Sequence, residues 1–194
     1  MKLKTKRTLI IVLVIVLSLL LGVLTDVVWT LVDRANYPQS YNELVEKYSE
    51  AYGVPEYLIY SVIKVESNFR PRAKSDVGAI GLMQMMPKTF DWLTGDEHLG
   101  EHLDARKLEE PEISIRYGTY YLKYLMNKFE LLDTALAAYN AGEGNVAAWL
   151  ENEEYSDGRG ALTDIPFSET ENYVIKVNNA IDHYKKLYYT DKEN

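Results

Sequence analysis

The longest hydrophobic stretch of the chain lies close to its N-terminus. Residues 8–25 form 18 consecutive positions without a charged side chain, and most of them are Leu, Ile or Val. This is the minimum length of a helix that crosses a bilayer, and residues 27–29 can extend it. We therefore predict a transmembrane signal anchor over residues 8–29, followed by a short stalk over residues 30–39.

Basic residues flank this stretch on its N-terminal side. Residues 1–7 contain four Lys or Arg side chains, which predicts a cytoplasmic N-terminus and a domain on the cell-wall side. Residues 22–26 do not fit the small-x-small pattern of a signal-peptidase site. An anchor that stays attached is therefore favoured over a removed signal peptide. The predicted location is the cell membrane, with a single span and an extracellular catalytic domain.

Beyond the stalk, apolar positions recur every three to four residues, which is the spacing of amphipathic helices. Alternation with period two is nowhere sustained, so the sequence predicts a mainly α domain over residues 40–190. A capping box at residues 40–43 opens the first helix, and Pro55, Pro87 and Pro111 stand where later helices begin. The predicted helices are 40–53, 55–66, 78–86, one from Pro87 to the polar segment 94–110, 111–129, 132–141, 143–151 and 168–189.

Glu66 occupies an apolar position of the predicted 55–66 helix. At about 100° per residue, it falls near the middle of a stripe of apolar side chains on the same helix. A carboxylate among apolar neighbours loses hydration, which raises its pKa and lets it hold a proton near neutral pH. The position favours a general acid, whereas a lone Glu at a helix end can instead turn to solvent. The stripe consists of Leu58, Ile59, Val62 and Ile63.

Composition restricts the possible partners. The first 25 residues contain four of the 21 basic residues and none of the 29 acidic ones, so the remainder carries a net charge of −12. An acidic surface repels phosphate backbones, which argues against nucleic acid as a partner. The chain has no cysteine. This excludes disulfides, thiol catalysis, cysteine-ligated zinc and lipid attachment through an N-terminal cysteine.

Three blocks of sequence carry the candidate chemistry, and they follow one another in the order and spacing of a known signature. Together they resemble the lytic transglycosylases of the soluble-transglycosylase (SLT) type, over about residues 40–190. The blocks are residues 66–89, 138–146 and 165–174, which contain Glu66-Ser67, Gly81-Leu82-Met83-Gln84, Ala138-Tyr139-Asn140-Ala141-Gly142 and Glu169-Thr170-x-x-Tyr173-Val174.

The resemblance implies a goose-type, lysozyme-like helical domain that acts on peptidoglycan glycan strands. Its reaction is cleavage of the β-1,4 bond between N-acetylmuramic acid and N-acetylglucosamine, which leaves 1,6-anhydromuramic ends. Glu66 matches the single catalytic acid and base, and the matching tyrosine, Tyr139, is expected to hold it. No metal or organic cofactor is implied. The residues that match substrate-groove positions are Ser75, Met83, Gln84, Tyr139, Asn140, Glu169 and Tyr173.

Several of these residues also have a plain structural role open to them. Ser75 can cap a helix, Met83 can fill the core, and Glu169 can favour the positive end of a helix. The sequence also departs from the family pattern, with Ser114 where Asn is usual and Glu171 where a basic residue is frequent. Both departures lie outside the expected chemistry.

Alternative functions remain open on the same residues. Asp76 or Asp91 could supply a second carboxylate, which would favour a goose-type muramidase that uses water. A weakly active glycan-binding scaffold of the cell-wall machinery is another possibility. His98 and His102 fit the H-x-x-E-H spacing of a zinc peptidase, but Gly100 between them weakens the helix that such a site needs. We expect both histidines to be exposed loop residues.

Overall fold

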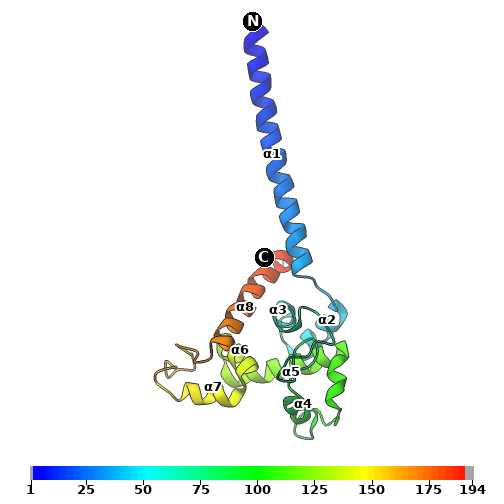
Figure 1. The fold of residues 1–194 in the computed structure, drawn as a ribbon, viewed down its shortest axis with the longest axis vertical. Helices are drawn as coiled ribbons and strands as arrows, with labels where there is room; N and C mark the ends of the chain where they lie inside the picture. Colours follow the sequence, from blue (N-terminus) through cyan, green and yellow to red (C-terminus); the bar gives the residue numbers. More distant parts are fainter. Residues whose placement is uncertain (1, 191–194) are drawn as a thin grey trace. The chain divides into compact units, whose positions relative to one another are not determined.

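The computed structural model describes residues 2–190, and the chain divides into two compact units. The first unit ends at Pro38 and the second begins at Gln39. The first unit is one helix, α1 (Lys2–Asn36), and the second holds the remaining helices (Figure 1).

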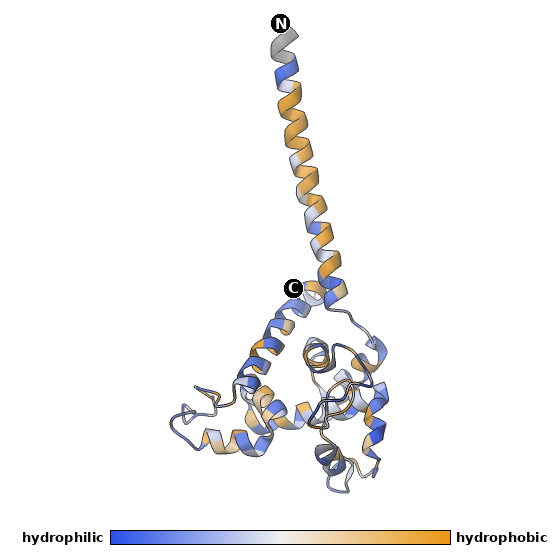
Figure 2. Ribbon diagram, in the orientation of Figure 1, coloured by the Kyte–Doolittle hydropathy of each residue, from blue (hydrophilic) through white to orange (hydrophobic). Residues whose placement is uncertain are grey.

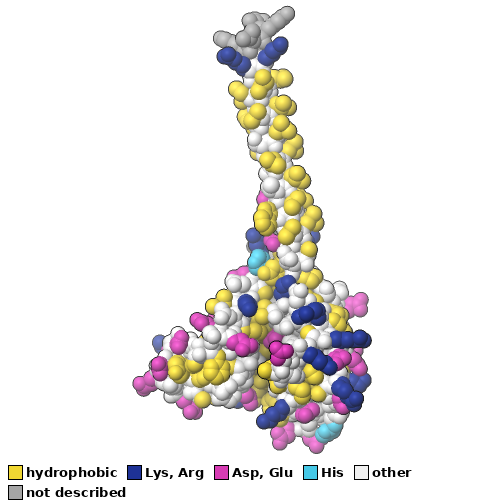
Figure 3. Space-filling view, in the orientation of Figure 1, with side chains coloured by type: hydrophobic (Ala, Val, Ile, Leu, Met, Phe, Trp, Pro, Cys, Tyr) yellow, Lys and Arg dark blue, Asp and Glu magenta, His cyan; other side chains and the backbone are white. Residues whose placement is uncertain are grey.

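Hydrophobic residues make up most of α1 (Figure 2), and hydrophobic side chains cover most of the face of this helix seen in Figure 3. Leu19, Leu20 and Leu21, which follow one another at about 100° around the helix, are all more than half exposed. A helix that is apolar all round is typical of a membrane span. Within the described residues, Lys6–Asn36 is the one helix long and apolar enough to cross a membrane.

The predicted stalk is mostly helical, because α1 continues without interruption to Asn36. Residues 30–36 contain neither Gly nor Pro, so nothing in this segment breaks the backbone hydrogen bonds of the helix. Pro38 ends it, since the residue before a proline is disfavoured in the helical conformation.

The second unit is a bundle of helices, and the mainly α prediction is confirmed. Helix α5 packs between α2 and α6, while α8 packs against both α3 and α6. Among residues 39–190, β-structure is limited to isolated bridges. The elements are α2 (Asn42–Tyr52), α3 (Glu56–Ser67), α4 (Pro87–Thr94), the 3₁₀ turn η1 (Ala105–Glu109), α5 (Pro111–Phe129), α6 (Leu132–Ala141), α7 (Glu143–Leu150), α8 (Ser168–Tyr184) and the π-helical turn η2 (Lys185–Tyr189).

Two predicted helix ends are wrong. The capping box at residues 40–43 does not form, because Tyr41 precedes α2 with φ 63° and no side chain caps the helix. At the other end of the domain, the regular helix stops at Tyr184 and a π-helical turn follows. In that turn the Tyr189 hydroxyl donates a hydrogen bond of 2.8 Å to Glu56, which ties the end of the described chain to α3.

The predicted helix over residues 78–86 is also wrong. This segment is a chain of turns joined by antiparallel bridges from Ile80 to Lys74 and to Met85. Gly78, Gly81 and Gln84 have φ values of 93°, 88° and 46°, which no right-handed helix contains. A side chain at Gly81 would collide with the backbone of Leu108, so glycine is required for the loop to lie this close to η1.

The 75–86 loop is held in place by contacts with the buried core. Met83 is fully buried and packs so closely on α5 that a side chain at Gly118 would overlap it. The Met83 backbone N–H donates to the Ser114 hydroxyl on the same helix at 3.2 Å. The loop of residues 75–86 is therefore anchored to α5, and its outer side is left to form the wall of a pocket.

Candidate active site

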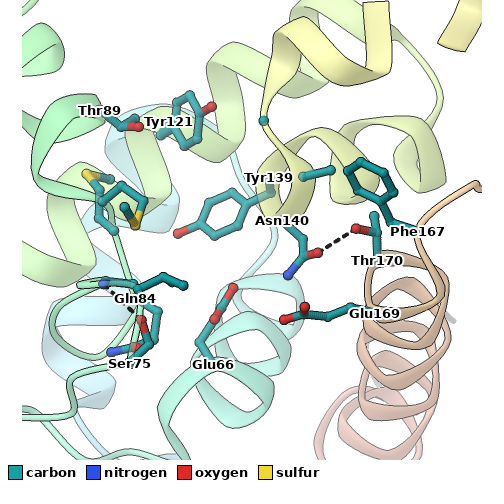
Figure 4. Close-up of a pocket in the computed structure, with 16 residues that line it drawn as sticks. Glu66, Ser75, Gln84, Thr89, Tyr121, Tyr139, Asn140, Phe167, Glu169 and Thr170 are labelled. Carbon is teal, nitrogen blue, oxygen red and sulfur yellow. Dashed lines mark hydrogen bonds between the residues drawn. The ribbon is translucent and has the colours of Figure 1, made fainter.

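A pocket of about 500 Å³ opens beside the last turn of α3 (Figure 4). Its walls come from the 75–86 loop, the C-terminal end of α6, the first turn of α8, and single side chains of α4 and α5. The polar and aromatic residues that line it are Glu66, Ser75, Gln84, Thr89, Tyr121, Tyr139, Asn140, Phe167, Glu169 and Thr170.

Glu66 reaches this pocket from the C-terminal turn of α3 and is partly exposed to it. Protein surrounds the carboxyl group on most sides, and this burial raises its pKa from 4.5 to about 8. The negative charge of Glu169 raises the pKa further. The C-terminal end of a helix carries partial negative charge, which also disfavours an ionised carboxylate there. The side chain is thus protonated at neutral pH.

Two buried tyrosines interact with Glu66 from α8 and α6. The Tyr173 hydroxyl acts on the carboxyl in the direction of a lower pKa, although it makes no well-aligned hydrogen bond with any described residue. The Tyr139 hydroxyl instead donates to the backbone carbonyl of Met83 at 2.8 Å. The proton of Tyr139 is therefore engaged by the 75–86 loop, and the expectation that this tyrosine holds Glu66 stays a prediction.

Asn140 and Thr170 join α6 to α8 at the edge of the pocket. The buried Thr170 hydroxyl donates to the side-chain oxygen of Asn140 at 2.8 Å (Figure 4). This bond fixes which end of the amide faces the cavity, so that the Asn140 NH₂ group is presented as a donor. Thr170 is a site residue that the sequence interpretation missed, although it directly follows Glu169 in the third block.

Ser75 and Gln84 brace the loop that carries them. The Ser75 hydroxyl accepts from the Ala79 N–H at 2.9 Å. The Gln84 amide nitrogen donates to the carbonyls of Ala73 and Gly81 at 3.0 and 2.9 Å. Since both donors of this amide serve the loop, its carbonyl oxygen is the atom left to accept from a ligand in the pocket.

Comparison with known proteins identifies the family. The family model for the transglycosylase SLT domain matches residues 43–160, which is more than half of the chain. The chain belongs to the SLT transglycosylase family. The matched range contains Glu66 and every residue of the 75–86 loop.

Curated relatives and solved structures agree with this assignment. The chain is 36% identical over 158 residues to the soluble lytic murein transglycosylase of Escherichia coli K12, covering 80% of this chain and 24% of the relative. It is 33% identical over 170 residues to the membrane-bound lytic murein transglycosylase C of Haemophilus ducreyi, covering 75% and 46%. The crystal structure of the 70 kDa soluble lytic transglycosylase of E. coli matches with a TM-score of 0.72 and 33% identity, covering 81% and 26%. The chain thus spans about a quarter of the soluble relatives and under half of the membrane-bound ones.

The fold class is confirmed by these neighbours, but two groove residues carried over from the family resemblance are wrong in position. Met83 is fully buried and lies behind the pocket, so it does not contact a ligand there. Tyr173 is also buried and absent from the lining, where it lies behind Glu66. Met85 and Met86, the next methionines along the loop, line the pocket instead.

Several apolar and aromatic lining residues were not anticipated. Phe167 and Val77 are 49% and 77% exposed and belong to the pocket wall, as does the buried Tyr121. The Phe167 ring is held edge-on by Trp149 of α7 at a centroid distance of 5.0 Å. An exposed aromatic ring in the wall of a polar pocket is suited to stack on the flat face of a ligand ring. The exposure of Phe167 and Val77 distinguishes them from core residues, and this is not visible in the sequence.

The H-x-x-E-H segment does not gather its side chains at one point. His98 packs on Trp92 at a centroid distance of 4.1 Å, and its Nδ1 lies 3.2 Å from the Tyr120 hydroxyl. His102 lies 2.9 Å from Asp96, while Glu101 turns to Arg116. The expectation of an exposed loop residue fails for His98, which is half-buried among aromatic rings. Across residues 2–190 no three side chains of metal-binding type come together.

The second carboxylate at the site is Glu169. Asp76 and Asp91 are exposed and lie outside the lining, so neither faces Glu66 across the pocket. Glu169, at the start of α8, is exposed and lines the pocket. A carboxylate there also suits the positive end of that helix.

Proposed function

We propose that this chain is a membrane-anchored lytic murein transglycosylase. The observation that carries the proposal is Glu66, a single desolvated carboxyl with a pKa of about 8 that faces a cavity able to hold sugars. A carboxyl that is protonated at neutral pH can donate its proton to a glycosidic oxygen. The names of the relatives supply the substrate class, which is the glycan of bacterial murein.

The first step is protonation of the leaving oxygen. Glu66 gives its proton to the oxygen of the β-1,4 bond between N-acetylmuramic acid and N-acetylglucosamine. The bond from this oxygen to the muramic anomeric carbon breaks, and the positive charge that develops on the sugar faces a carboxylate that has just formed. The acidic side chain of Glu169, which also lines the pocket, adds to this negative field.

The second step uses the same side chain as a base. The Glu66 carboxylate removes the proton from the muramic O6 hydroxyl while O6 attacks the anomeric carbon. This closes a 1,6-anhydro ring and restores the protonated acid, so no water enters the product. A raised pKa suits both steps, because the acid form predominates at rest and the conjugate base is strong enough to take the proton.

The remaining polar groups of the lining would position the glycan. The Asn140 NH₂ group is the fixed donor, and the free carbonyl oxygen of Gln84 is the fixed acceptor. An N-acetyl group presents one acceptor and one donor, which is the complementary pair. Ser75 and the Phe167 ring would contact the sugar from the two walls.

Glu169 supports a second candidate, a muramidase that uses water on the same bond. Most glycoside hydrolases use a pair of carboxyl groups that flank the bond to be cleaved. Here the protonated Glu66 would act as the acid, and the exposed Glu169 would activate water or stabilise the cation. The two candidates differ in their products, which makes them separable.

We propose the following division of the chain. Residues 1–7 lie in the cytoplasm and residues 8–29 cross the membrane. Residues 30–39 connect this span to the catalytic domain, residues 40–190, on the cell-wall side of the membrane. The support is the apolar, exposed surface of α1 and the membrane-bound relatives, of which the one from Haemophilus ducreyi shares 33% identity with this chain.

The test is digestion of purified murein by the full chain in detergent, followed by mass analysis of the released fragments. Ends lighter by one water than the hydrolysis product support the transglycosylase, and reducing ends support the muramidase. Glu66→Gln removes the acid, while Asp76→Asn alters an exposed carboxylate outside the pocket and serves as the matched control. Glycan binding without release of any fragment would contradict both enzymatic candidates and favour a scaffold.

A further inference from the structure

Aromatic and basic side chains gather around Gln39, the first residue of the second unit. The Gln39 amide donates to the Tyr189 hydroxyl at 3.3 Å, and this hydroxyl donates to Glu56 at 2.8 Å. The Tyr189 ring meets Tyr57 edge-on at a centroid distance of 5.7 Å. The Lys185 ammonium lies 4.6 Å from the centre of the Tyr57 ring. We call these five residues the Gln39 face.

The Gln39 face has side chains of the kind found at membrane interfaces. Tyr57 and Tyr189 are half-buried, and Lys185 is exposed. Among residues 2–190, no carboxylate forms an ion pair with Lys185. Tyrosine combines an apolar ring with a polar hydroxyl, and lysine combines an apolar stem with a charged end. Both residue types therefore suit the headgroup layer of a bilayer.

The covalent connection to α1 keeps Gln39 close to the bilayer. In the proposed span, residue 29 marks the outer end, and α1 continues as a helix to Asn36. Seven helical residues rise about 10 Å, and the three residues from Asn36 to Gln39 add at most about 10 Å. Gln39 therefore lies within about 20 Å of the hydrocarbon boundary, in whatever direction the domain turns. The headgroup layer occupies about 5–7 Å of this distance.

The pocket of Glu66 lies at the opposite end of the helix pair that carries this face. Tyr60 of α3 stacks on Tyr184, at the C-terminal end of α8, with a centroid distance of 5.4 Å. Glu66, in the last turn of α3, interacts with Tyr173 nearer the start of α8. The two helices therefore run antiparallel. Nine residues of α3 separate Glu66 from Tyr57, which corresponds to about 14 Å.

We propose that the Gln39 face docks on the headgroups of anionic phospholipids in the leaflet from which α1 emerges. This rests on the proposed function in one respect, the membrane span of α1. Lys185 contacts lipid phosphates, while Tyr57 and Tyr189 enter the headgroup layer beside it. The short connection makes docking an intramolecular event, so weak contacts are sufficient. Docking holds Glu66 at the end of α3 that is remote from the bilayer.

The experiment uses the full chain in nanodiscs of phosphatidylglycerol and phosphatidylcholine. Because the chain has no cysteine, one introduced Cys carries a fluorophore at a chosen position. Ser40→Cys places the fluorophore beside the Gln39 face, and Asp76→Cys places it on the 75–86 loop; both positions are exposed. Lipids with a nitroxide headgroup quench only a fluorophore that is close to the headgroups. We expect strong quenching at position 40 and little at position 76.

A charge reversal tests the contact with lipid phosphate. Lys185→Glu is expected to lower the ratio of docked to undocked chains about fivefold or more, because a basic side chain near an anionic surface becomes acidic. The quenching at position 40 falls accordingly. Lys88→Glu makes the same change at an exposed position of α4, at the pocket end of the domain. It is the matched control and leaves the quenching unchanged.

Four results would overturn the docking. They are equal quenching at positions 40 and 76, quenching that Lys185→Glu leaves unchanged, the same quenching in nanodiscs of phosphatidylcholine alone, and fluorescence at position 40 that follows the chain concentration instead of the nitroxide lipid. The last result would assign the face to a second copy of the chain. A chain that does not assemble into nanodiscs would contradict the membrane span as well. Murein cleavage is not part of the readout, so the result is independent of the chemistry of Glu66.

Discussion

Two glutamates of this domain, Glu66 and Glu101, both lie near tyrosines, but their pKa values are shifted in opposite directions. Glu101, in the polar segment before η1, lies 2.7 Å from the Arg116 guanidinium and accepts from the Tyr117 hydroxyl at 2.8 Å. These bonds hold its pKa below the ordinary value. Glu66 also lies beside tyrosines, but burial raises its pKa to about 8.

The two sites differ in that Glu101 is paired with a cation, Arg116, whereas Glu66 is not. A tyrosine hydroxyl acts on each of the two carboxyl groups in the direction of a lower pKa, so tyrosine alone does not decide the outcome. Among residues 2–190, Glu66 has no ion pair, and the charge that shifts its pKa is another carboxylate, Glu169. An acid is therefore made here by burial without a basic partner, whereas Glu101 serves to hold a loop on α5.

The largest expected effect comes from removing the proton of Glu66. Glu66→Gln keeps the shape and a donor NH₂ group but can no longer transfer a proton, so murein cleavage falls about 10³-fold or more. Glu101→Gln, the control, removes a carboxylate whose pKa is lowered by Arg116, and it keeps most of the cleavage activity. Release of soluble muropeptides measures both. An active Glu66→Gln variant would show that the proton comes from elsewhere.

The second effect concerns stability at alkaline pH. The folded state binds a proton at Glu66 up to about pH 8, whereas the unfolded state releases it near pH 4.5. Stability is therefore full below the lower value and is lost as the pH rises through the interval, by on the order of 5 kcal/mol. Urea denaturation at pH 5 and pH 8.5 measures this loss. The Glu66→Gln variant lacks the titration, so its loss over the same interval is smaller than that of the wild type.

A smaller effect on stability is expected when Arg116, the cation beside Glu101, is removed. Arg116→Met leaves Glu101 without its partner, so the pKa of Glu101 rises and the loop is held less firmly. Both side chains are partly exposed, at 26% and 33%, which limits the cost to about 1 kcal/mol. The double variant with Glu101→Gln recovers part of the loss in a denaturation cycle. Strictly additive losses would show that the pair is not coupled.

The smallest effect is expected from the second carboxylate of the pocket. Glu169→Gln removes a negative charge that raises the pKa of Glu66, so the alkaline limb of the kcat/KM profile moves to lower pH. The exposed Glu171→Gln, one residue from Thr170, is the matched control and leaves the limb in place. If Glu169→Gln abolishes cleavage at every pH, Glu169 has a direct role and the muramidase candidate gains.

Features set by local sequence were predictable here. Pro87 and Pro111 stand at the first positions of their helices, and helical periodicity was enough to place Glu66 on an apolar face. The 78–86 segment was not predictable in this way. The positive φ value at Gly81 accompanies close packing against Leu108 and Ser114, which are distant in the sequence.

In the pocket too, residues in recognisable sequence blocks were predictable, whereas positions set by contacts between distant segments were not. Glu66, Gln84 and Asn140 were identified from the sequence blocks, and all of them line the pocket. Met83 was misplaced because neighbouring methionines of an irregular loop point in different directions, which no period predicts. Thr170 was missed because its importance comes from the antiparallel packing of α6 on α8.

The most direct measurement is the ionisation of the Glu66 carboxyl itself. Infrared difference spectra between the wild-type chain and Glu66→Gln, recorded as a function of pH, isolate the C=O band of the protonated acid. We predict that this band is present at pH 7 and disappears around pH 8. A carboxylate that is already ionised at pH 5 would contradict the central claim that burial without a cation makes Glu66 the acid.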